Sequence, residues 1–395
     1  MNLYLKANED KRIRAGHLWV FSNEVDNQRS PLKDFSAGQI TQLYSHNNRC
    51  LGVVYVNPNS LICARLLDSN PRLLVDLEFF LTRLRDALAL RESQYATPYY
   101  RLVFSEADYL PGLVIDRYDG CLVIQINSYG MEVHKELIVE AVNRLLAPNT
   151  IVLKNDSAIR ELEGLARYVE TIQGSAPSPL QVKESQLSFY CDLLEGQKTG
   201  WFYDHRDNRD ALQHYAGGAR VLDVYSYVGA WSLHALYHGA KSVCAVDASA
   251  KALDYLRHNA EVNGYANAVT CMQGDALEQL RHLHNEKQVF DLIVLDPPAF
   301  IKRKKDLKKG SEAYQQINNQ AMKLLRHGGI LISASCSYHL SELQLKDVLL
   351  RAAKHNAKRL QFLQQGFQSR DHPWHPAIPE TRYLKSFVCR LLNNT

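Results

Sequence analysis

The chain has 395 residues, of which 46% are hydrophobic, and it carries a formal net charge of +4. Its length allows two or three domains with substantial cores, whereas the small net charge excludes binding to nucleic acid through bulk charge alone, so any basic surface must be local. No apolar run is long enough to cross a membrane, and residues 1–6 lack the apolar core of a signal peptide. We therefore expect a cytoplasmic protein with no membrane partner.

The eight cysteines form no C-x-x-C pair and have no histidines at zinc-finger spacing, so we predict no metal site. Most of them lie in apolar runs, which is typical of buried small side chains in a reducing compartment. They are Cys50, Cys63, Cys121, Cys191, Cys244, Cys271, Cys336 and Cys389.

Residues 1–70 predict a small β-barrel. Short apolar or alternating segments are separated by turn-rich stretches, of which 45–48 and 57–60 are the clearest. A compact barrel is the natural packing for such strands. The predicted strands are 18–21, 38–43, 51–56 and 61–66.

The segment 11–21 mixes cations, including Arg14, with aromatic side chains, including Trp19. Nucleic-acid surfaces use this mixture for phosphate contact and base stacking. Arg14 and Trp19 are therefore candidates for nucleic-acid contact. In an equally acceptable interpretation, Trp19 and Phe21 belong to the core and the cations are only solvated.

Residues 71–174 predict a second, α+β domain in which strands flank helices. The expected elements are helices over 71–90 and 132–146 and strands over 100–105, 113–118, 121–126 and 151–155. The stretch Gly-Ser-Ala-Pro-Ser-Pro at 174–179 predicts a linker. We expect the third domain to occupy 180–395.

The third domain is organised around residues 220–247. An apolar run ending in an acid, a turn containing Gly229, a helical pattern and a second apolar run ending in Asp247 predict a β-α-β unit of a parallel sheet. Gly229 would let the turn backbone approach a nucleoside ligand, and Asp247 would accept hydrogen bonds from both ribose hydroxyls. Because no G-x-G-x-x-G shapes the turn for a pyrophosphate, S-adenosylmethionine fits better than a dinucleotide.

Two further strands end in acids. Asp275 follows one of them, and its carboxylate could reach the adenine amine. The strand 290–295 runs into Asp296-Pro297-Pro298, where two prolines hold polar groups rigidly beside the cofactor. Upstream, the segment 196–209 is dense in cations, acids and aromatic residues and could clamp the methionine end of the cofactor. A helix N-terminus with surface ion pairs is the alternative interpretation.

A basic run follows the Asp296 motif. Charge runs are usually only solvated, but this one adjoins the predicted site, so we interpret it as a phosphate-contact loop. Its cations are Lys302, Arg303, Lys304, Lys305, Lys308 and Lys309. A helix over 314–325 is expected to end at His327-Gly328-Gly329, and a fifth strand over 330–334 then leads to Ser335-Cys336-Ser337.

The third domain resembles class I S-adenosylmethionine-dependent methyltransferases in the order of its motifs and their position at strand ends. These motifs are Asp223–Gly229, Asp247, Asp275, Asp296-Pro297-Pro298 and Ser335-Cys336-Ser337. The whole chain, most specifically the stretch 196–209, resembles the bacterial 23S ribosomal RNA cytosine-5 methyltransferases. This resemblance implies an α/β fold in which a Rossmann-like methyltransferase domain follows an N-terminal PUA-like RNA-binding barrel and an RRM-like α+β domain.

The resemblance implies methyl transfer from S-adenosylmethionine to carbon 5 of a cytosine in 23S ribosomal RNA. Because carbon 5 is a poor nucleophile, a thiolate first adds to carbon 6, the resulting enamine attacks the methyl group, and a base removes the carbon-5 proton. Cys336, in its polar Ser-Cys-Ser setting, suits the thiol. Asp296 would bind the cytosine edge, either as an acid donating to N3 or as a carboxylate accepting from the amine.

The sequence does not indicate an oligomeric state. We predict that the cofactor contacts Tyr203, Arg206, Asp223, Tyr225, Ser226, Gly229, Asp247, Ala248, Asp275, Ala276, Asp296 and Pro297. We predict that RNA contacts Lys302, Arg303, Lys304, Lys305, Lys308, Lys309, Arg14 and Trp19.

One position departs from the family pattern. Many RNA cytosine-5 methyltransferases carry a second cysteine directly after the Asp-Pro-Pro motif, which is thought to assist product release, and Ala299 occupies that position here. Either another base resolves the adduct, or the reaction is N-methylation of an RNA base. Amino-methyltransferases grip an amine with an acid or amide, two prolines and an aromatic residue, and Phe300 lies one residue beyond that spacing. A non-catalytic RNA-binding module is a third reading, against which the strand-end acids and Cys336 argue.

Overall fold

The computed structural model describes residues 1–196 and 199–393 and contains two compact units. The first unit comprises residues 1–178, 193–201 and 370–381, and the second comprises 179–192, 202–369 and 382–395. Gln197 and Lys198, within the predicted clamp segment, lie outside the described residues. No helix in the described part of the chain is long and apolar enough to cross a membrane.

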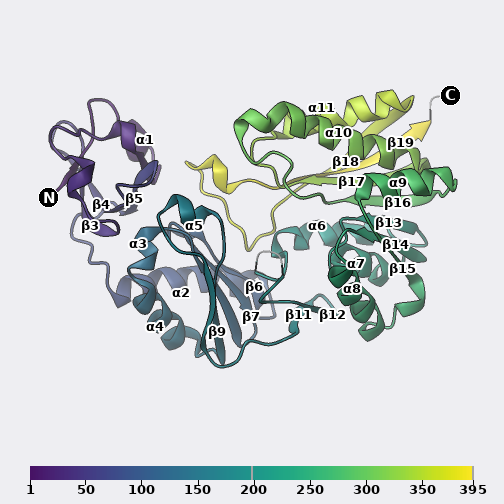
Figure 1. Cartoon of the computed structure of the whole chain (residues 1–395), viewed down its shortest axis with the longest axis horizontal. Helices are drawn as coiled ribbons and strands as arrows, with labels where there is room; N and C mark the ends of the chain where they lie inside the picture. Colours follow the sequence, from purple (N-terminus) through teal and green to yellow (C-terminus); the bar gives the residue numbers. More distant parts are fainter. Residues whose placement is uncertain (197–198, 394–395) are drawn as a thin grey trace. The chain divides into compact units, whose positions relative to one another are not determined.

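The first unit begins with a five-stranded sheet that has its own core. Its elements are β1 (Leu3–Tyr4), α1 (Lys11–Arg14), β2 (Trp19–Phe21), β3 (Gln39–Tyr44), β4 (Cys50–Val56) and β5 (Ile62–Asp68). The strand order is β1-β3-β4-β5-β2, with β1 parallel to β3 and the other neighbours antiparallel. Figure 1 labels β3, β4, β5 and α1 of this part. Val20, Leu43 and Val54 are among the side chains buried inside it. All four strands predicted in residues 1–70 are present.

A second five-stranded sheet follows in the same unit. Its elements are α2 (Leu77–Gln94), β6 (Tyr99–Phe104), β7 (Leu113–Tyr118), β8 (Cys121–Ile126), α3 (Tyr129–Glu132), α4 (Lys135–Leu146), β9 (Thr150–Asn155), α5 (Ile159–Leu162) and β10 (Tyr168–Gln173), with strand order β10-β9-β8-β7-β6. Helices α2 and α4 pack together and share one core with the sheet. Helix α2 begins later than predicted because the Asp76 side chain caps it, accepting from the backbone N–H of Phe79 at 3.0 Å.

Buried polar contacts join the barrel to the α+β part of the first unit. Arg65 of β5 donates from Nη2 to Oε1 of Glu163 at 2.9 Å, and Nδ2 of Asn57 donates to the other carboxylate oxygen at 2.9 Å. The Tyr55 hydroxyl donates to the Pro111 carbonyl at 3.1 Å. Because removing one partner of a buried ion pair leaves an uncompensated charge, these contacts hold the two parts of the unit in one arrangement.

The second unit is built on a seven-stranded sheet. Its strands are β13 (Arg220–Val224), β14 (Ser242–Asp247), β15 (Val269–Gln273), β16 (Phe290–Leu295), β17 (Leu325–Ser335), β18 (Lys358–Phe367) and β19 (Lys385–Asn393), and a separate hairpin contains β11 (Leu180–Glu184) and β12 (Leu187–Cys191). The order is β15-β14-β13-β16-β17-β19-β18. The first five strands are parallel and β19 is antiparallel to both neighbours, so the carboxyl ends of β13 to β17 meet at one edge of the sheet.

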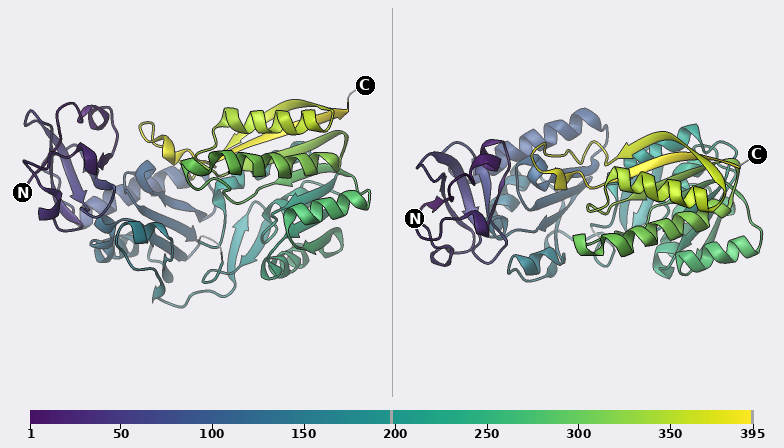
Figure 2. Two further views of the ribbon diagram at one scale, coloured as in Figure 1. Left: turned by 45° about the horizontal axis from the view of Figure 1, so that its top comes forward. Right: turned by 90° about the horizontal axis from the view of Figure 1, so that it is seen from above.

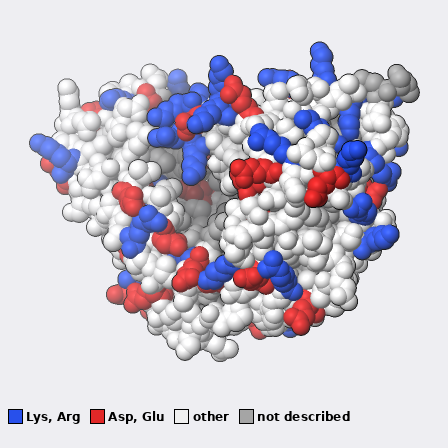
Figure 3. Space-filling view, turned by 45° about the vertical axis from the view of Figure 1, so that its right-hand side comes forward, with Lys and Arg blue, Asp and Glu red and all other residues white. Residues whose placement is uncertain are grey.

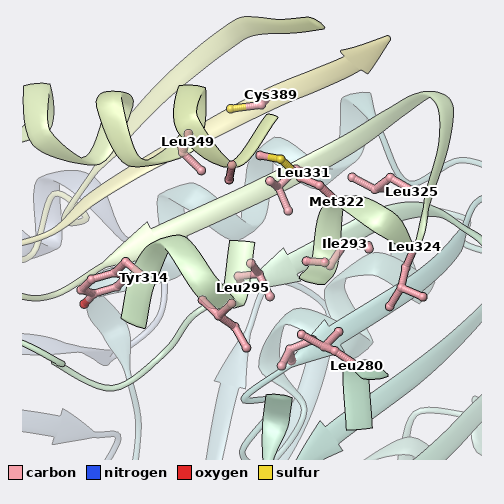
Figure 4. Close-up of a cluster of buried hydrophobic side chains, with 14 of the residues drawn as sticks. Leu280, Ile293, Leu295, Tyr314, Met322, Leu324, Leu325, Leu331, Leu349 and Cys389 are labelled. Atoms are coloured by element: carbon pink, nitrogen blue, oxygen red, sulfur yellow. The ribbon is translucent and has the colours of Figure 1, made fainter. Parts of the chain in front are cut away.

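Helices cover both faces of this sheet (Figure 1). They are α6 (Arg206–Asp210), α7 (Ala230–Tyr237), α8 (Ala250–Val262), α9 (Ala276–Asn285), α10 (Leu307–Lys323) and α11 (Glu342–His355). Helices α10 and α11 lie side by side (Figure 2) and share a core with α9 and the central strands. Leu280, Ile293, Leu331, Leu349 and Cys389 belong to this core (Figure 4).

Two sequence predictions in this unit are wrong. Lys304 and Lys305 lie in the 3-10 helix η7 (Lys304–Asp306) and α10 begins at Leu307, so Lys304, Lys305, Lys308 and Lys309 belong to helices and not to a loop. The segment His327-Gly328-Gly329 does not end a helix but lies inside β17, where the register with β16 shifts and Gly328 takes a φ of +73°. The molecular face in Figure 3 carries cations interleaved with acidic side chains, which agrees with the small net charge.

Candidate functional site

The turn between β13 and α7 contains the first acid of the predicted cofactor site. Asp223 is fully buried near the end of β13, and its Oδ2 accepts a hydrogen bond from Oγ of Ser232 at 2.6 Å. Burial, opposed by this hydrogen bond but reinforced by the charge of Asp296, raises the pKa of Asp223 to about 7. Oδ1 of Asp223 and Oγ of Ser226 are buried and have no hydrogen-bond partner among the described residues.

The same turn contains three residues with left-handed backbone conformations. Tyr225, Tyr227 and Gly229 have φ of +67°, +49° and +91°. The backbone N–H of Tyr225 donates to the Val246 carbonyl at 2.9 Å. A Cβ at Gly229 would lie 2.7 Å from Cγ of Leu256 on α8. Glycine is therefore required here by its φ and by the packing of α8, reasons that sequence reasoning did not give.

Asp247 and Asp275 lie at the ends of the two strands beyond β13. The Asp247 carboxylate accepts backbone N–H bonds from Tyr227 and Ser249, both at 2.9 Å, which fixes its orientation. Asp275 is exposed, and its Oδ1 caps the N-terminus of α9. Because each carboxylate oxygen has more than one lone pair, both acids retain acceptor capacity for a ligand. Of the other predicted contacts at these turns, Ala248 is exposed, whereas Ala276 and Pro297 are buried.

Asp296 follows β16 and is held by two aromatic rings from other segments. Nε2 of His205 lies 3.1 Å from Oδ1, and Nε1 of Trp231 donates to Oδ2 at 3.1 Å. Burial acts to raise the pKa of Asp296, but the adjacent His205 and the hydrogen bonds from both rings lower it below its ordinary value. Asp296 is therefore ionised at neutral pH and can only accept hydrogen bonds.

Cys336 comes directly after β17, and its sulfur lies 4.0 Å from the backbone carbonyl oxygen of Pro297. The two neighbouring serines turn into the protein. Oγ of Ser335 donates to the Tyr314 hydroxyl at 2.9 Å, and Oγ of Ser337 lies 2.9 Å from the same hydroxyl. Both serines are buried, whereas Cys336 is partly exposed. The thiol thus lies beside the end of β16.

Tyr203 and Arg206, the predicted clamp residues, are both buried within the second unit. The Arg206 guanidinium lies 5.1 Å from the centre of the Tyr203 ring, and its Nε is 3.4 Å from Oε2 of Glu184. Glu184 also accepts from Nε and Nη2 of Arg209 at 2.6 and 2.8 Å. These ion pairs with Glu184 are therefore buried and are not surface pairs.

The predicted RNA contacts differ in their exposure. All six cations of the basic run are exposed, and Arg303 lies 3.3 Å from Asp306. In the first unit, Arg14 is exposed at the end of α1. Trp19 is partly buried, and its Nε1 donates to Oε1 of Glu106 at 2.9 Å, across the junction between the barrel and the α+β part.

Sequence reasoning did not identify His205, Trp231 or Tyr314 as site residues. His205 lies in the predicted clamp segment and Trp231 lies two residues after Gly229, so closeness to a motif was the only available signal. Tyr314 was recognised only as the first residue of a predicted helix. Among the described residues, no three His, Cys, Asp or Glu side chains gather as metal ligands would.

These residues fit S-adenosylmethionine. The turn after β13 offers buried polar atoms without partners at Asp223 and Ser226, which suit a ligand with several polar groups. The Asp247 carboxylate lies at the end of the next strand, where a nucleoside ribose binds in folds of this type. The turn after β13 lacks G-x-G-x-x-G, the glycine pattern that shapes a turn for a diphosphate.

The sheet order and the strand-end acids define a Rossmann-like, class I methyltransferase fold, which confirms the predicted fold class. The profile of the family described as "S-adenosylmethionine-dependent methyltransferase" matches residues 164–390, and the chain belongs to this family. The predicted cofactor is thereby confirmed. The "PUA-like domain" profile matches residues 3–69, which identifies the N-terminal barrel.

Curated relatives match the chain over nearly its full length. It is 34% identical to the "Ribosomal RNA large subunit methyltransferase I" of Alteromonas mediterranea, over 99% of this chain and 98% of that one. It is 36% identical to the protein of the same name from Aeromonas salmonicida, over 98% of each chain. Among solved structures, SMU.776 complexed with SAH superposes with a TM-score of 0.85 at 20% identity, covering 99% of this chain and 100% of that one, so the two share their fold.

Proposed function

We propose that this enzyme methylates carbon 5 of a cytosine in 23S ribosomal RNA, with Cys336 as the nucleophile that adds to carbon 6. The names of the full-length relatives and the PUA-like barrel support a large-subunit RNA substrate. The observation that carries the mechanism is the position of the Cys336 sulfur, 4.0 Å from the Pro297 carbonyl, at the strand end next to Asp296. This position supports our assignment, because Pro297 directly follows Asp296, the residue that would bind the base.

In the proposed reaction, the Cys336 thiolate forms a bond to carbon 6 of the cytosine, which makes carbon 5 a nucleophilic enamine carbon. S-adenosylmethionine, when bound, would supply the methyl group: as carbon 5 bonds to the methyl carbon, the bond from that carbon to the sulfonium sulfur would break, and S-adenosylhomocysteine would leave. A base removes the carbon-5 proton, the electron pair re-forms the double bond between carbons 5 and 6, and the carbon–sulfur bond breaks. The thiolate is thereby regenerated.

In this proposal, Asp296 binds the exocyclic amine of the cytosine. Its lowered pKa favours the ionised form, and an ionised carboxylate accepts from the amine. His205 and Trp231 each bind one carboxylate oxygen and fix its plane. The alternative in which Asp296 donates a proton to N3 is disfavoured by the same contacts.

RNA contact is assigned to the basic run 302–309 and to a groove in the first unit. The groove has a volume of about 910 Å³ and is lined by residues of the barrel, α2, the turn before β7 and the segment 370–381. Cations and rings lie among its lining residues: Arg14, Arg49, Arg83, Tyr109 and His375. Guanidinium groups suit phosphates, and the exposed Tyr109 ring suits a base, whereas His375 is buried. Trp19 is partly buried and hydrogen-bonded to Glu106, which favours a role in the packing of the first unit over contact with RNA.

N-methylation is the second candidate, and the environment of Phe300 weighs against it. The Phe300 ring packs against Tyr314, with 4.8 Å between ring centroids, and edge-on to Tyr225, with 6.4 Å between centroids. Phe300 thus borders the hydrophobic core of the second unit and is engaged by two other rings. An amine grip needs an aromatic face free to stack on the base.

Nucleoside mass spectrometry tests the proposal. Large-subunit RNA from a strain lacking the gene is incubated with purified enzyme and S-adenosylmethionine, and 5-methylcytidine is expected to appear. The Cys336→Ser variant should form none while still binding the cofactor in isothermal titration, and Cys271→Ser, which alters another partly buried cysteine, should behave as wild type. An N-methylated nucleoside would instead support the second candidate.

A further inference from the structure

Lys385 is a buried cation that sequence reasoning did not identify. It is the first residue of β19, lies opposite Ser335 in the register with β17, and is only 4% exposed. Its Nζ donates to the carbonyl oxygens of Ser337 and Leu340 at 2.7 and 2.6 Å. These two carbonyls belong to the segment that follows Cys336. A single ammonium thus ties down the backbone on the C-terminal side of the cysteine.

Among the described residues, the charged groups that act on Lys385 include Cys336, Glu342 and Arg382. Burial lowers the pKa of Lys385 to about 8, negative charge on Cys336 and Glu342 raises it, and the Arg382 cation lowers it further. Glu342 in turn lies 2.9 Å from Arg382 and so is partly neutralised. Another titratable group that interacts with the cysteine is the Tyr314 hydroxyl, whose pKa burial raises to about 12. Lys385 is therefore cationic at neutral pH.

We propose that Lys385 is a positioning residue for Cys336: it fixes the backbone after the cysteine, and its positive charge favours the thiolate. The electrostatic interaction is reciprocal, because a thiolate that stabilises the ammonium is stabilised by it to the same extent. No proton passes between the two groups. The inference rests on the proposed function, in which that thiolate is the nucleophile.

The pH dependence of Cys336 alkylation tests this role in the full chain. Purified protein without RNA or cofactor is treated with iodoacetamide at a series of pH values, and modification of the Cys336 peptide is followed by mass spectrometry. In Lys385→Met the midpoint of alkylation should rise by about one pH unit, so that alkylation at neutral pH is roughly tenfold slower. Lys385→Arg keeps the charge and should stay closer to wild type.

Lys358 provides a matched control. Its Nζ also donates to two backbone carbonyls, those of Met322 and Leu325, at 2.6 and 3.0 Å. Burial likewise lowers the pKa of Lys358. Lys358→Met should therefore cost stability in a similar way and leave the Cys336 midpoint unchanged. An unchanged midpoint in Lys385→Met, or an equal rise in Lys358→Met, would overturn the proposal.

If Lys385→Met does not fold, the wild-type protein alone can test whether the native structure favours the Cys336 thiolate. The Cys336 midpoint is then compared between the native chain and the same chain in urea. A lower midpoint in the native chain is expected, and an equal or higher one would overturn the proposal. Since this assay contains no RNA, its result is independent of which base is methylated, which the nucleoside measurement decides separately.

Discussion

Asp223 and Asp296 are two acids whose surroundings drive their pKa values apart. Asp296 receives two ring donors and has a lowered pKa, whereas the pKa of buried Asp223 rises to about 7, partly because of the Asp296 charge. Pairs of this kind commonly mark sites of chemistry. The Asp296 carboxylate is therefore a fixed anion at the end of β16. Asp223, with a pKa of about 7, is protonated in only part of the molecules at neutral pH.

His205 is expected to keep Asp296 ionised. His205→Leu removes a donor from a charged acceptor, an interaction of about 1.5–3 kcal/mol, so kcat/KM should fall roughly 10- to 100-fold. Removing a group that lowers the pKa of Asp296 raises that pKa. Activity that needs the carboxylate should then be lost at a higher pH as the solution is acidified. A kcat/KM profile against pH measures both effects.

His205→Gln is the control for this prediction, because the amide can still donate to the carboxylate. Its acid limb should lie between those of the wild type and His205→Leu. If the two variants shared one profile with the wild type, Asp296 would not depend on His205.

Among the elements, the turn from β13 into α7 is constrained by three residues in left-handed conformations. Gly229→Ala places a Cβ in a left-handed conformation, at a cost of about 1–2 kcal/mol, and drives it against Leu256, which adds ~1–3 kcal/mol. Gly264 is the control, because it has a φ of +79° but nothing within 4 Å of its Cβ position. Gly264→Ala therefore carries only the conformational cost. Thermal unfolding should show a larger loss for Gly229→Ala than for Gly264→Ala. Equal losses would mean that the contact with α8 does not matter.

The elements that the sequence predicts well are those with one apolar periodicity and a clear boundary. The strands 113–118 and 121–126 were predicted with the observed bounds because a turn separates two apolar runs. Strand β10 was missed because its four central residues are exposed, and two of them, Val169 and Ile172, are apolar, so the sequence shows no core-facing pattern. The glycines at 328–329 predicted a helix end, but sheet pairing with β16 overrides that local preference.

At the scale of the whole molecule, the RNA-contact candidates fall into both units. If the exposed cations of the basic run contact phosphates, reversing Lys304, Lys305 and Lys308 to Glu should weaken RNA binding. It should also reduce the slope of log K against log salt by up to about 0.9 for each lost contact. Fluorescence anisotropy with large-subunit RNA at several salt concentrations measures this.

Reversal of Arg351 and Lys354, exposed cations on α11, is the control for the charge change. It should leave the slope nearly unaltered. A slope that falls equally in both variants would indicate a general charge effect and not a contact surface.

The strand-end acids and Cys336 could be predicted because a parallel sheet brings the carboxyl ends of its strands together whatever the loops between them. The partners of those residues could not. His205 reaches Asp296, and Lys385 reaches the segment after Cys336, from distant parts of the sequence. Only the folded packing defines such pairs, since no spacing in the chain encodes them.

Covalent trapping tests the central claim most directly. Large-subunit RNA transcribed with 5-fluorocytidine is incubated with the enzyme and S-adenosylmethionine. Fluorine at carbon 5 cannot leave as a proton does, so the adduct at carbon 6 should persist. We expect a denaturation-resistant RNA–protein complex whose cross-linked peptide contains Cys336, and none with Cys336→Ser. Formation of 5-methylcytidine on ordinary RNA without any trapped complex, or a complex through another residue, would contradict the proposed mechanism.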